Sequence, residues 1–300
     1  MFNYQRKLNT TLIRGLAMKH ASHIYATAAL IFCLSAQYAL AAKPELEILV
    51  LFDNTSARED LRRSWGFSAL IDFRGRRVLF DAGSDPILLL EHLDKMQIDP
   101  KSIEHAVISH QHGDHLRGVY WVFEKNPKMT VHFLDNFPEE AFRRAKAVGM
   151  KPRRVKGPFE VVPGIYSTGI VDGQPPEQSL LIETSQGLVM LVGCSHPGVV
   201  KLVETAQSQR KQDSIHLLLG GFHMLRKQPD EIKAAITKLQ ELNVKTAMPA
   251  HCSGDLATEL FQVAYGDQFN KAGVGRKIVL GHEGLVISTL ENKQQANEQR

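Results

Sequence analysis

Short apolar runs separated by amphipathic segments recur along most of the chain. Runs of largely apolar, partly branched residues predict strands, here at residues 46–52, 77–80, 106–108, 188–192, 215–219, 246–248, 277–280 and 285–287. In the segments between several of them, apolar residues recur at helical spacing and form a stripe that would lie on a sheet. Strands that alternate with amphipathic helices favour α/β layers, in which ligands sit at strand ends.

Proline shortly after a polar residue marks where two of the helices should begin. Ser84-Asp85-Pro86 opens the first, in which Leu89 and Leu93 follow at helical spacing, and Asn136-Phe137-Pro138 opens the second, which runs to about residue 148. Three further helices are predicted at residues 199–207, 229–242 and 256–265. The charged residues 56–63 are expected to form a surface loop or a short helix.

The amino terminus differs from the rest of the chain. Four basic residues precede an uncharged stretch at residues 25–34 and Ala39-Leu40-Ala41, a small-x-small cleavage pattern. This order is typical of a secretory signal peptide, so residues 1–42 are predicted to be the signal and residues 43–300 one domain that is periplasmic or secreted. An uncleaved membrane anchor is the alternative, but the strongly apolar part spans only about ten residues, half of what a bilayer requires.

Removing the predicted signal changes the charge balance. It takes away four basic side chains and no acidic ones, so the formal charge falls from +4 to 0. The basic pairs that remain, Arg143-Arg144 and Arg153-Arg154, are short and typical of a solvated surface. We therefore expect a small-molecule substrate rather than a nucleic acid, and no stable membrane span after cleavage.

Residues 109–115, Ser-His-Gln-His-Gly-Asp-His, carry the strongest chemical signal. This segment follows a predicted strand and places three imidazoles and a carboxylate within six residues. Neutral imidazoles and carboxylates bind zinc and related divalent ions. A tight loop would turn His110 and His112 toward one point, while its glycine allows a bend that directs Asp114 and His115 toward a second. The segment is therefore predicted to serve two metal ions.

This histidine segment resembles the H-x-H-x-D-H signature of the metallo-β-lactamase superfamily. Upstream, residues 78–83 are similar to the family's strand-end aspartate segment, and downstream, residues 249–252 are similar to the segment of its last histidine ligand. Four further runs resemble the branch named for dihydropterin ribofuranosyl-aminobenzene phosphate synthase, namely residues 177–180, 193–198, 220–223 and 251–254. The resemblance covers about residues 46–290 and implies an αββα sandwich, with two sheets packed face to face between helices.

The resemblance also implies a set of metal ligands, of which this chain matches His110, His112, Asp114, His115 and His251. The superfamily usually adds another histidine and a bridging aspartate, but near residues 174–179 and 193–194 this chain has neither. His196 is expected to complete the set, with Cys194 as the alternative, since imidazole and thiolate both bind zinc. The expected groups are His110, His112 and His196 around one ion, and Asp114, His115 and His251 around the other.

Four other residues near these ligands have two interpretations each. Asp81 is expected to orient a ligand or the loop rather than to bind metal. Cys194 is either a ligand or a small buried apolar residue. A disulfide with Cys252 would compete with metal for the thiol, so free thiols are expected. His223 either acts on the substrate or is a hydrogen-bonded histidine at a strand end.

Together these features predict an exported metal-dependent hydrolase. Two divalent ions, zinc or else manganese or iron, would provide a metal-bound hydroxide that attacks a small ester, lactone or phosphodiester. Asp114 would orient that hydroxide, and His223 would protonate the leaving group or hold an anionic substrate. The alternatives are an iron-dependent redox enzyme on the same fold, the branch's pterin-pathway ribosyl-transfer synthase, which export disfavours, and a metal-binding module without turnover.

Overall fold

The computed structural model describes residues 43–281 and 283–291, and the predicted signal at residues 1–42 lies outside the described residues. The described residues from Pro44 onward belong to one compact unit. Among the residues described, no helix has the length and apolar character needed to cross a membrane.

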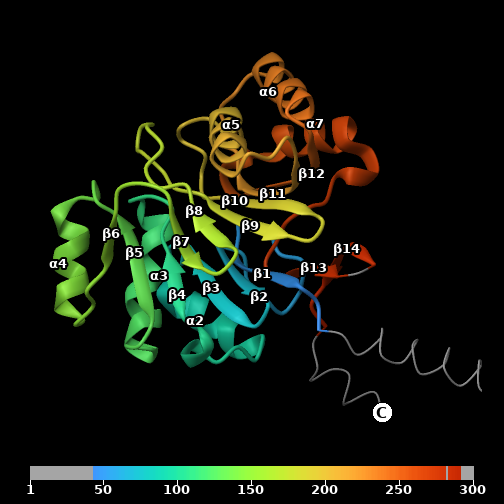
Figure 1. Cartoon of the computed structure of the whole chain (residues 1–300). Helices are drawn as coiled ribbons and strands as arrows, with labels where there is room; N and C mark the ends of the chain where they lie inside the picture. The colour runs from blue at the N-terminus through green and yellow to red at the C-terminus, as the bar shows by residue number, and fades with distance from the viewer. Residues whose placement is uncertain (1–42, 282, 292–300) are drawn as a thin grey trace, which may run out of the picture. The chain divides into compact units, whose positions relative to one another are not determined.

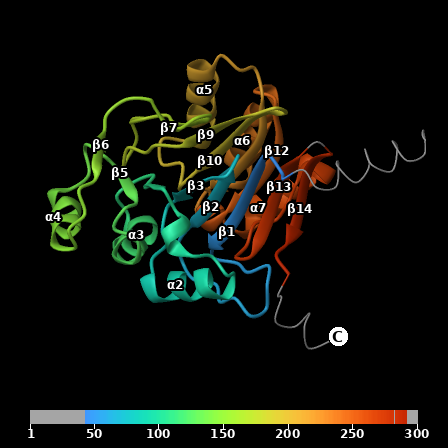
Figure 2. The same ribbon diagram turned by 60° about the horizontal axis from the view of Figure 1, so that its bottom comes forward.

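The strands of this unit form two sheets. The strands are β1 (Leu46–Phe52), β2 (Ser68–Phe73), β3 (Arg76–Phe80), β4 (His105–Val107), β5 (Thr130–Leu134), β6 (Arg153–Val155), β7 (Phe159–Val162), β8 (Ile165–Ser167), β9 (Leu180–Thr184), β10 (Gly187–Val192), β11 (Ile215–Gly221), β12 (Val244–Ala250), β13 (Arg276–Gly281) and β14 (Gly284–Thr289). The eight-stranded sheet has the order β14-β13-β1-β2-β3-β4-β5-β6, and the six-stranded sheet has the order β12-β11-β10-β9-β8-β7. Figure 2 shows β14, β13, β1, β2 and β3 side by side in the first sheet.

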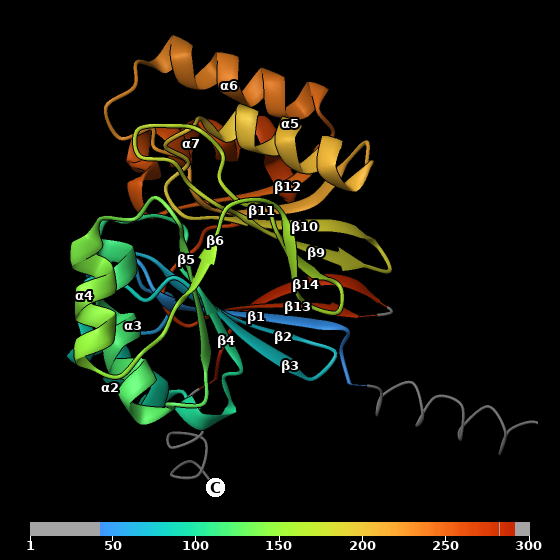
Figure 3. The same cartoon turned by 60° about the vertical axis from the view of Figure 1, so that its left-hand side comes forward.

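The helices cover the outer faces of the two sheets (Figures 1 and 3). They are α2 (Pro86–Lys95), α3 (Gly113–Lys125), α4 (Glu139–Ala147), α5 (Val199–Arg210), α6 (Pro229–Glu241) and α7 (Asp255–Tyr265), with 3-10 turns η1 (Pro100–Ser102), η2 (His251–Ser253) and η3 (Gly266–Gln268). Helices α2 to α4 pack on the first sheet and helices α5 to α7 on the second, each through its own apolar core. A third core lies between the sheets.

Strand β1 shows why this arrangement has four layers. Because successive side chains of a strand point to opposite faces, Ile48 and Val50 enter the core between the sheets, whereas Leu49 and Leu51 pack against the helices. Both faces are thus buried, which explains the unbroken apolar run in the sequence. The predicted αββα sandwich is confirmed.

The predicted strands and helices are all present, with small differences at their ends. Helix α3 was not predicted, because the glycine and polar residues of its first turn are typical of a loop. The short strands β2 and β5 to β9 were not predicted either. Residues 56–63 contain no helix, and the expectation of a surface segment was wrong for Arg58 and Leu61, which are buried.

The direction of the strands determines where the site lies. Strands β3 to β6 are parallel to one another in the first sheet, and β10 to β12 are parallel in the second. Loops that follow the carboxyl ends of parallel strands gather at one edge of a sheet, where ligands commonly bind. The loops after β3, β4, β10, β11 and β12 contain most of the predicted site residues.

A buried histidine in β5 makes the stability of the fold depend on pH. His132 is 1% exposed, its Nε2 lies 3.1 Å from Nδ1 of His105, and its ring stacks on Phe159. Burial, together with the neighbouring His105, lowers the pKa of His132 to about 3. In the unfolded chain a histidine has a pKa of about 6.5, so between these two values only the unfolded state takes up the proton.

We therefore expect the protein to lose stability as the pH falls from about 6.5 toward 3. The substitution His132→Phe should make the free energy of unfolding less steep with pH, by up to about 1.4 kcal/mol per pH unit. Urea unfolding of the wild type and the variant at pH 7, 6 and 5 measures this difference. Parallel curves for the two proteins would contradict it.

Candidate functional site

The carboxylate of Asp81 holds the histidine segment in place from the end of β3. Its oxygens accept hydrogen bonds from the backbone N–H and the hydroxyl of Ser109, both at 2.7 Å. Helix α3 then begins at Gly113, so Asp114 and His115 lie in its first turn rather than in a loop. His115 is fully buried, whereas the side of the segment that carries His112 is exposed.

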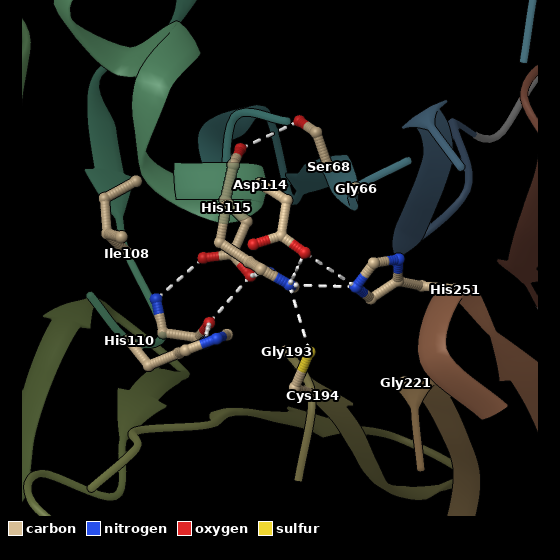
Figure 4. A network of polar contacts seen from close by, with 12 residues as sticks. Gly66, Ser68, Ile108, His110, Asp114, His115, Gly193, Cys194, Gly221 and His251 are labelled. Carbon is tan, nitrogen blue, oxygen red and sulfur yellow. Dashed lines mark hydrogen bonds and ion pairs between the residues drawn. The ribbon is translucent and has the colours of Figure 1, made fainter. Parts of the chain in front are cut away.

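The predicted ligands converge in two groups, as expected. In each group the donor atoms lie within 4.8 Å of one another, and the groups are His110, His112 and His196, and Asp114, His115 and His251. Figure 4 shows the side chains of His110, Asp114, His115 and His251 pointing toward a common centre. They come from the loop after β4, from helix α3 and from the turn after β12.

The distances in the second group suit a divalent metal ion. Nε2 of His251 lies 3.2 Å from Nε2 of His115 and 3.3 Å from Oδ2 of Asp114. Two nitrogens bound to one tetrahedral zinc at 2.0 to 2.1 Å are themselves about 3.3 Å apart. The atoms therefore have the spacing of ligands, and their binding of metal stays a prediction.

Buried nitrogen atoms without partners support the same interpretation of the first group. Nε2 of His110 and Nε2 of His196 are buried and have no hydrogen-bond partner among the described residues. A buried polar atom without a partner costs about 1–3 kcal/mol. A cation that binds imidazole requires neutral rings whose free nitrogen atoms face a common point, as these two nitrogens do.

Hydrogen bonds fix the orientation of three of these imidazoles. In each of them Nδ1 forms a hydrogen bond, which leaves Nε2 free to face the point where the candidate ligands meet. The pairs are His115 with Asp81 at 2.7 Å, His110 with the Ser109 hydroxyl at 2.9 Å, and His251 with Oδ1 of Asn54 at 3.0 Å. The orienting role expected of Asp81 agrees with this geometry. Asn54 was not predicted, although its place two residues after the apolar run of β1 is a signal for it.

Glu177 is a second residue whose role was not predicted. Its side chain is fully buried, and its Oε1 accepts backbone hydrogen bonds from Gly193, Cys194 and Ser195 at 2.8 to 3.1 Å. Its Oε2 accepts the backbone N–H of His196 at 2.9 Å. Glu177 thus stands where the superfamily pattern led us to expect a histidine ligand, and it holds the loop after β10 instead.

The charges around the two groups differ. Burial, reinforced by neighbouring histidines, lowers the pKa of His196 to about 3 and that of His110 well below its usual value. Burial also acts to lower the pKa of His115, but the Asp81 carboxylate overcomes it and raises that pKa to about 9. The imidazoles of His110 and His196 in the first group are thus neutral near pH 7, whereas the carboxylates of Asp81 and Asp114 favour positive charge at the second group.

The structure brings both Cys194 and His196 to the centre. His196 belongs to the first group, while Sγ of Cys194 lies 3.2 Å from Nε2 of His115. Cys194 and Cys252 are both free, as expected. His223 has a left-handed backbone with φ 53°, and the centroid of its exposed ring lies 4.3 Å from that of His196.

Two cavities open beside the centre and share Trp65 and Leu225 in their walls. One, of about 310 Å³, reaches His251, and the other, of about 590 Å³, reaches His223 and Cys252. Trp65 also donates a hydrogen bond from Nε1 to Oδ2 of Asp114 at 2.8 Å. A small molecule in the smaller cavity would therefore touch the candidate ligand His251, and one in the larger cavity would touch His223.

Known proteins share this sequence pattern and fold. A sequence profile of the metallo-beta-lactamase superfamily matches residues 66–210. A relative from Methanocaldococcus jannaschii, 7,8-dihydropterin-6-methyl-4-(beta-D-ribofuranosyl)-aminobenzene-5'-phosphate synthase, is 24% identical over 261 residues, which cover 71% of this chain and 89% of the relative. An uncharacterised protein of the same organism is 28% identical over 276 residues, covering 80% of this chain and 99% of that protein.

A solved structure has a similar fold. The crystal structure of Tm1679, a metal-dependent hydrolase of the beta-lactamase superfamily, has a TM-score of 0.63 at 24% identity and covers 77% of this chain and 98% of that protein. The synthase carries the name of the branch that the four sequence runs resemble. Residues 66–210 therefore match the metallo-β-lactamase superfamily, within a fold that the chain shares with Tm1679.

Proposed function

We propose that the protein is a metal-dependent hydrolase of small anionic esters, with phosphodiesters as the foremost substrates. The observation that carries this proposal is the convergence of two groups of metal-binding side chains beside an open cavity. When bound there, divalent cations would lower the pKa of a coordinated water and polarise an oxygen of the substrate.

The residues of the chain prepare the site for this chemistry. Burial opposes ionisation of Asp114, but hydrogen bonding to His251 and the charge of His115 hold the pKa of its carboxyl well below the usual value. Asp114 is therefore a carboxylate at neutral pH, and Trp65 holds it in place. From this position it accepts a hydrogen bond from the attacking water and orients it toward the substrate.

Free cations at the mouths of the cavities support an anionic substrate. Arg63 and Lys271 line the smaller cavity, Arg226 lines the larger one, and none of the three forms an ion pair within residues 43–281 and 283–291. Between them, Trp65 and Leu225 provide an apolar surface. A flat or apolar group that carries a phosphate or carboxylate fits this combination.

Measurement of metal-dependent hydrolysis tests the proposal. The purified chain is stripped with a chelator, reloaded with zinc, manganese or iron, and assayed with bis(p-nitrophenyl) phosphate, p-nitrophenyl acetate and a lactone. We expect turnover only after reloading, and a higher kcat/KM for the phosphodiester than for the neutral ester. The substitution Arg226→Ala should raise KM for the anionic substrate alone. Full activity of the stripped protein, or a preference for the neutral ester, would overturn the proposal.

A second candidate is a synthase reaction like the one named for the relative from Methanocaldococcus jannaschii. The similarity, which covers 71% of this chain, favours it, and the name of that relative's product includes a 5'-phosphate, an anionic group. Export is part of our main proposal, because residues 1–42 have the composition of a signal peptide. Cell fractionation separates the two candidates, since an uncleaved chain in the cytosol would favour the synthase.

A further inference from the structure

Three side chains at the edge of the two ligand groups lie close to one another. The thiol sulfurs of Cys194 and Cys252 and a ring nitrogen of His223 are all within 4.8 Å of each other. We propose that they form a third ligand group, rich in sulfur, for a thiophilic divalent ion such as zinc or cadmium. The proposal does not depend on ester hydrolysis, although Cys194 also borders the second ligand group at His115. It assigns His223 to metal binding rather than to the leaving group.

The second sheet itself brings these side chains together. Cys194, His223 and Cys252 each lie two residues beyond the last residue of β10, β11 and β12, which are parallel neighbours in register. Val192 pairs with Gly220, and Gly221 pairs with Ala250, so the three strands end at nearly the same level. The meeting of the three side chains therefore follows from the parallel register of β10, β11 and β12.

The backbone leaves room for the sulfur atoms. Gly221 lies beside Cys194 in Figure 4, and a Cβ atom added to it would lie 2.6 Å from the carbonyl oxygen of Gly193 and 2.7 Å from Sγ of Cys252. Real Cβ atoms essentially never lie at either distance. A side chain at position 221 would thus force the Gly193 backbone or the thiol of Cys252 to move.

The donor set differs from those of the two other groups. Two thiolates and an imidazole form a soft set that selects zinc and related thiophilic ions, whereas imidazole and carboxylate also accept manganese and iron. The surroundings of the thiols are polar, because Sγ of Cys194 lies 3.2 Å from Nε2 of His115 and Cys252 donates a weak hydrogen bond to the Cys194 carbonyl. This is not the apolar setting of a cysteine that merely fills space.

An ion can reach this group from solvent. His223 is exposed, and both His223 and Cys252 line the cavity of about 590 Å³. Three protein ligands would leave a fourth position of a tetrahedral ion open toward that cavity. The proposed group thus has ligands, space and an entry path.

Cobalt substitution tests the proposal, because cobalt bound to thiolates has a sulfur-to-metal charge-transfer band whose intensity grows with the number of thiolates. The full chain carrying Cys33→Ser, in which only Cys194 and Cys252 remain, is titrated with Co²⁺ and then with Cd²⁺ as a competitor. We expect a band from two thiolates, about half that intensity in Cys252→Ser, and at least 10-fold weaker Cd²⁺ binding in His223→Ala.

The outcomes separate this group from its alternatives. Equal band intensity in Cys252→Ser and its parent would show that Cys194 alone binds metal, and a Cys194–Cys252 disulfide in protein purified without reductant would show redox pairing instead. Either result overturns the proposal, as does unchanged Cd²⁺ affinity in His223→Ala, whose exposed side chain can be removed without unfolding the chain. Because the readout is spectroscopic, the result stands whether or not the protein hydrolyses esters.

Discussion

Replacing His112 with alanine is expected to abolish turnover and to weaken metal binding at the first ligand group. The ring of His112 lies with its centroid 4.8 Å from those of His110 and His196. Its removal leaves only two imidazoles for that ion. Loss of residues that merely orient ligands costs 10-fold to 100-fold in metal affinity, so loss of a ligand should cost at least as much.

The exposure of His112 makes this variant informative, because its side chain can be removed without opening a cavity in the core. Metal content is measured by mass spectrometry after dialysis against a chelator of known affinity, and turnover with the phosphodiester. His216→Ala is the matched control, since His216 lies on β11 and lines a cavity with Lys245 and Gln268, away from the candidate ligands. Unchanged metal content and turnover in His112→Ala would show that the first group binds no catalytic ion.

The candidate ligands of the histidine segment could be predicted from the sequence because they are close together in the chain. His110, His112, Asp114 and His115 lie within six residues, and that spacing reveals their chemistry without any knowledge of the fold. The long apolar runs identified the strands in the same way, since both faces of β1 and β10 are buried. When consecutive positions of a strand are all buried, the sequence shows an unbroken apolar run, which can be recognised without knowing the fold.

The residues that hold the ligands could not be found in this way. Asn54 contacts His251 across 197 residues of chain, and Glu177 contacts the loop that it holds across 16 to 19 residues. No periodicity links such partners. The first contact exists only after the two sheets have packed together, since β1 and β12 belong to different sheets, and the second only after β9 and β10 have paired. The missing superfamily histidine near Glu177 was a visible departure, but the sequence did not show what took its place.

The substitution Glu177→Gln changes few atoms, but it should disturb the site strongly. The carboxylate satisfies four backbone N–H groups, three through Oε1 and that of His196 through Oε2. An amide has one oxygen, so its NH₂ group would face at least one N–H across about 3 Å. Hydrogen bonds to a charged group contribute about 1.5–3 kcal/mol each, and we expect the free energy of unfolding to fall by at least that amount.

The loss should also be selective between the two ligand groups. The loop held by Glu177 contains His196, a member of the first group. Asp114, His115 and His251 come from other elements, and only the charge of His115 interacts with this carboxylate. We therefore expect 10-fold to 100-fold weaker binding of one ion and little change at the other. Competitive chelator titration resolves the two affinities, and Glu124→Gln on the exposed face of α3 is the matched control.

The pH of this measurement matters, because burial raises the pKa of Glu177 to about 7 against the opposing hydrogen bonds from His196 and Ser195. A protonated carboxyl, like an amide, would present a donor to the loop, so near pH 6 the wild type should approach the variant. At pH 8 the comparison is between a carboxylate and an amide, and the difference should be largest. Two unchanged affinities at pH 8 would mean that the loop keeps His196 in place without Glu177.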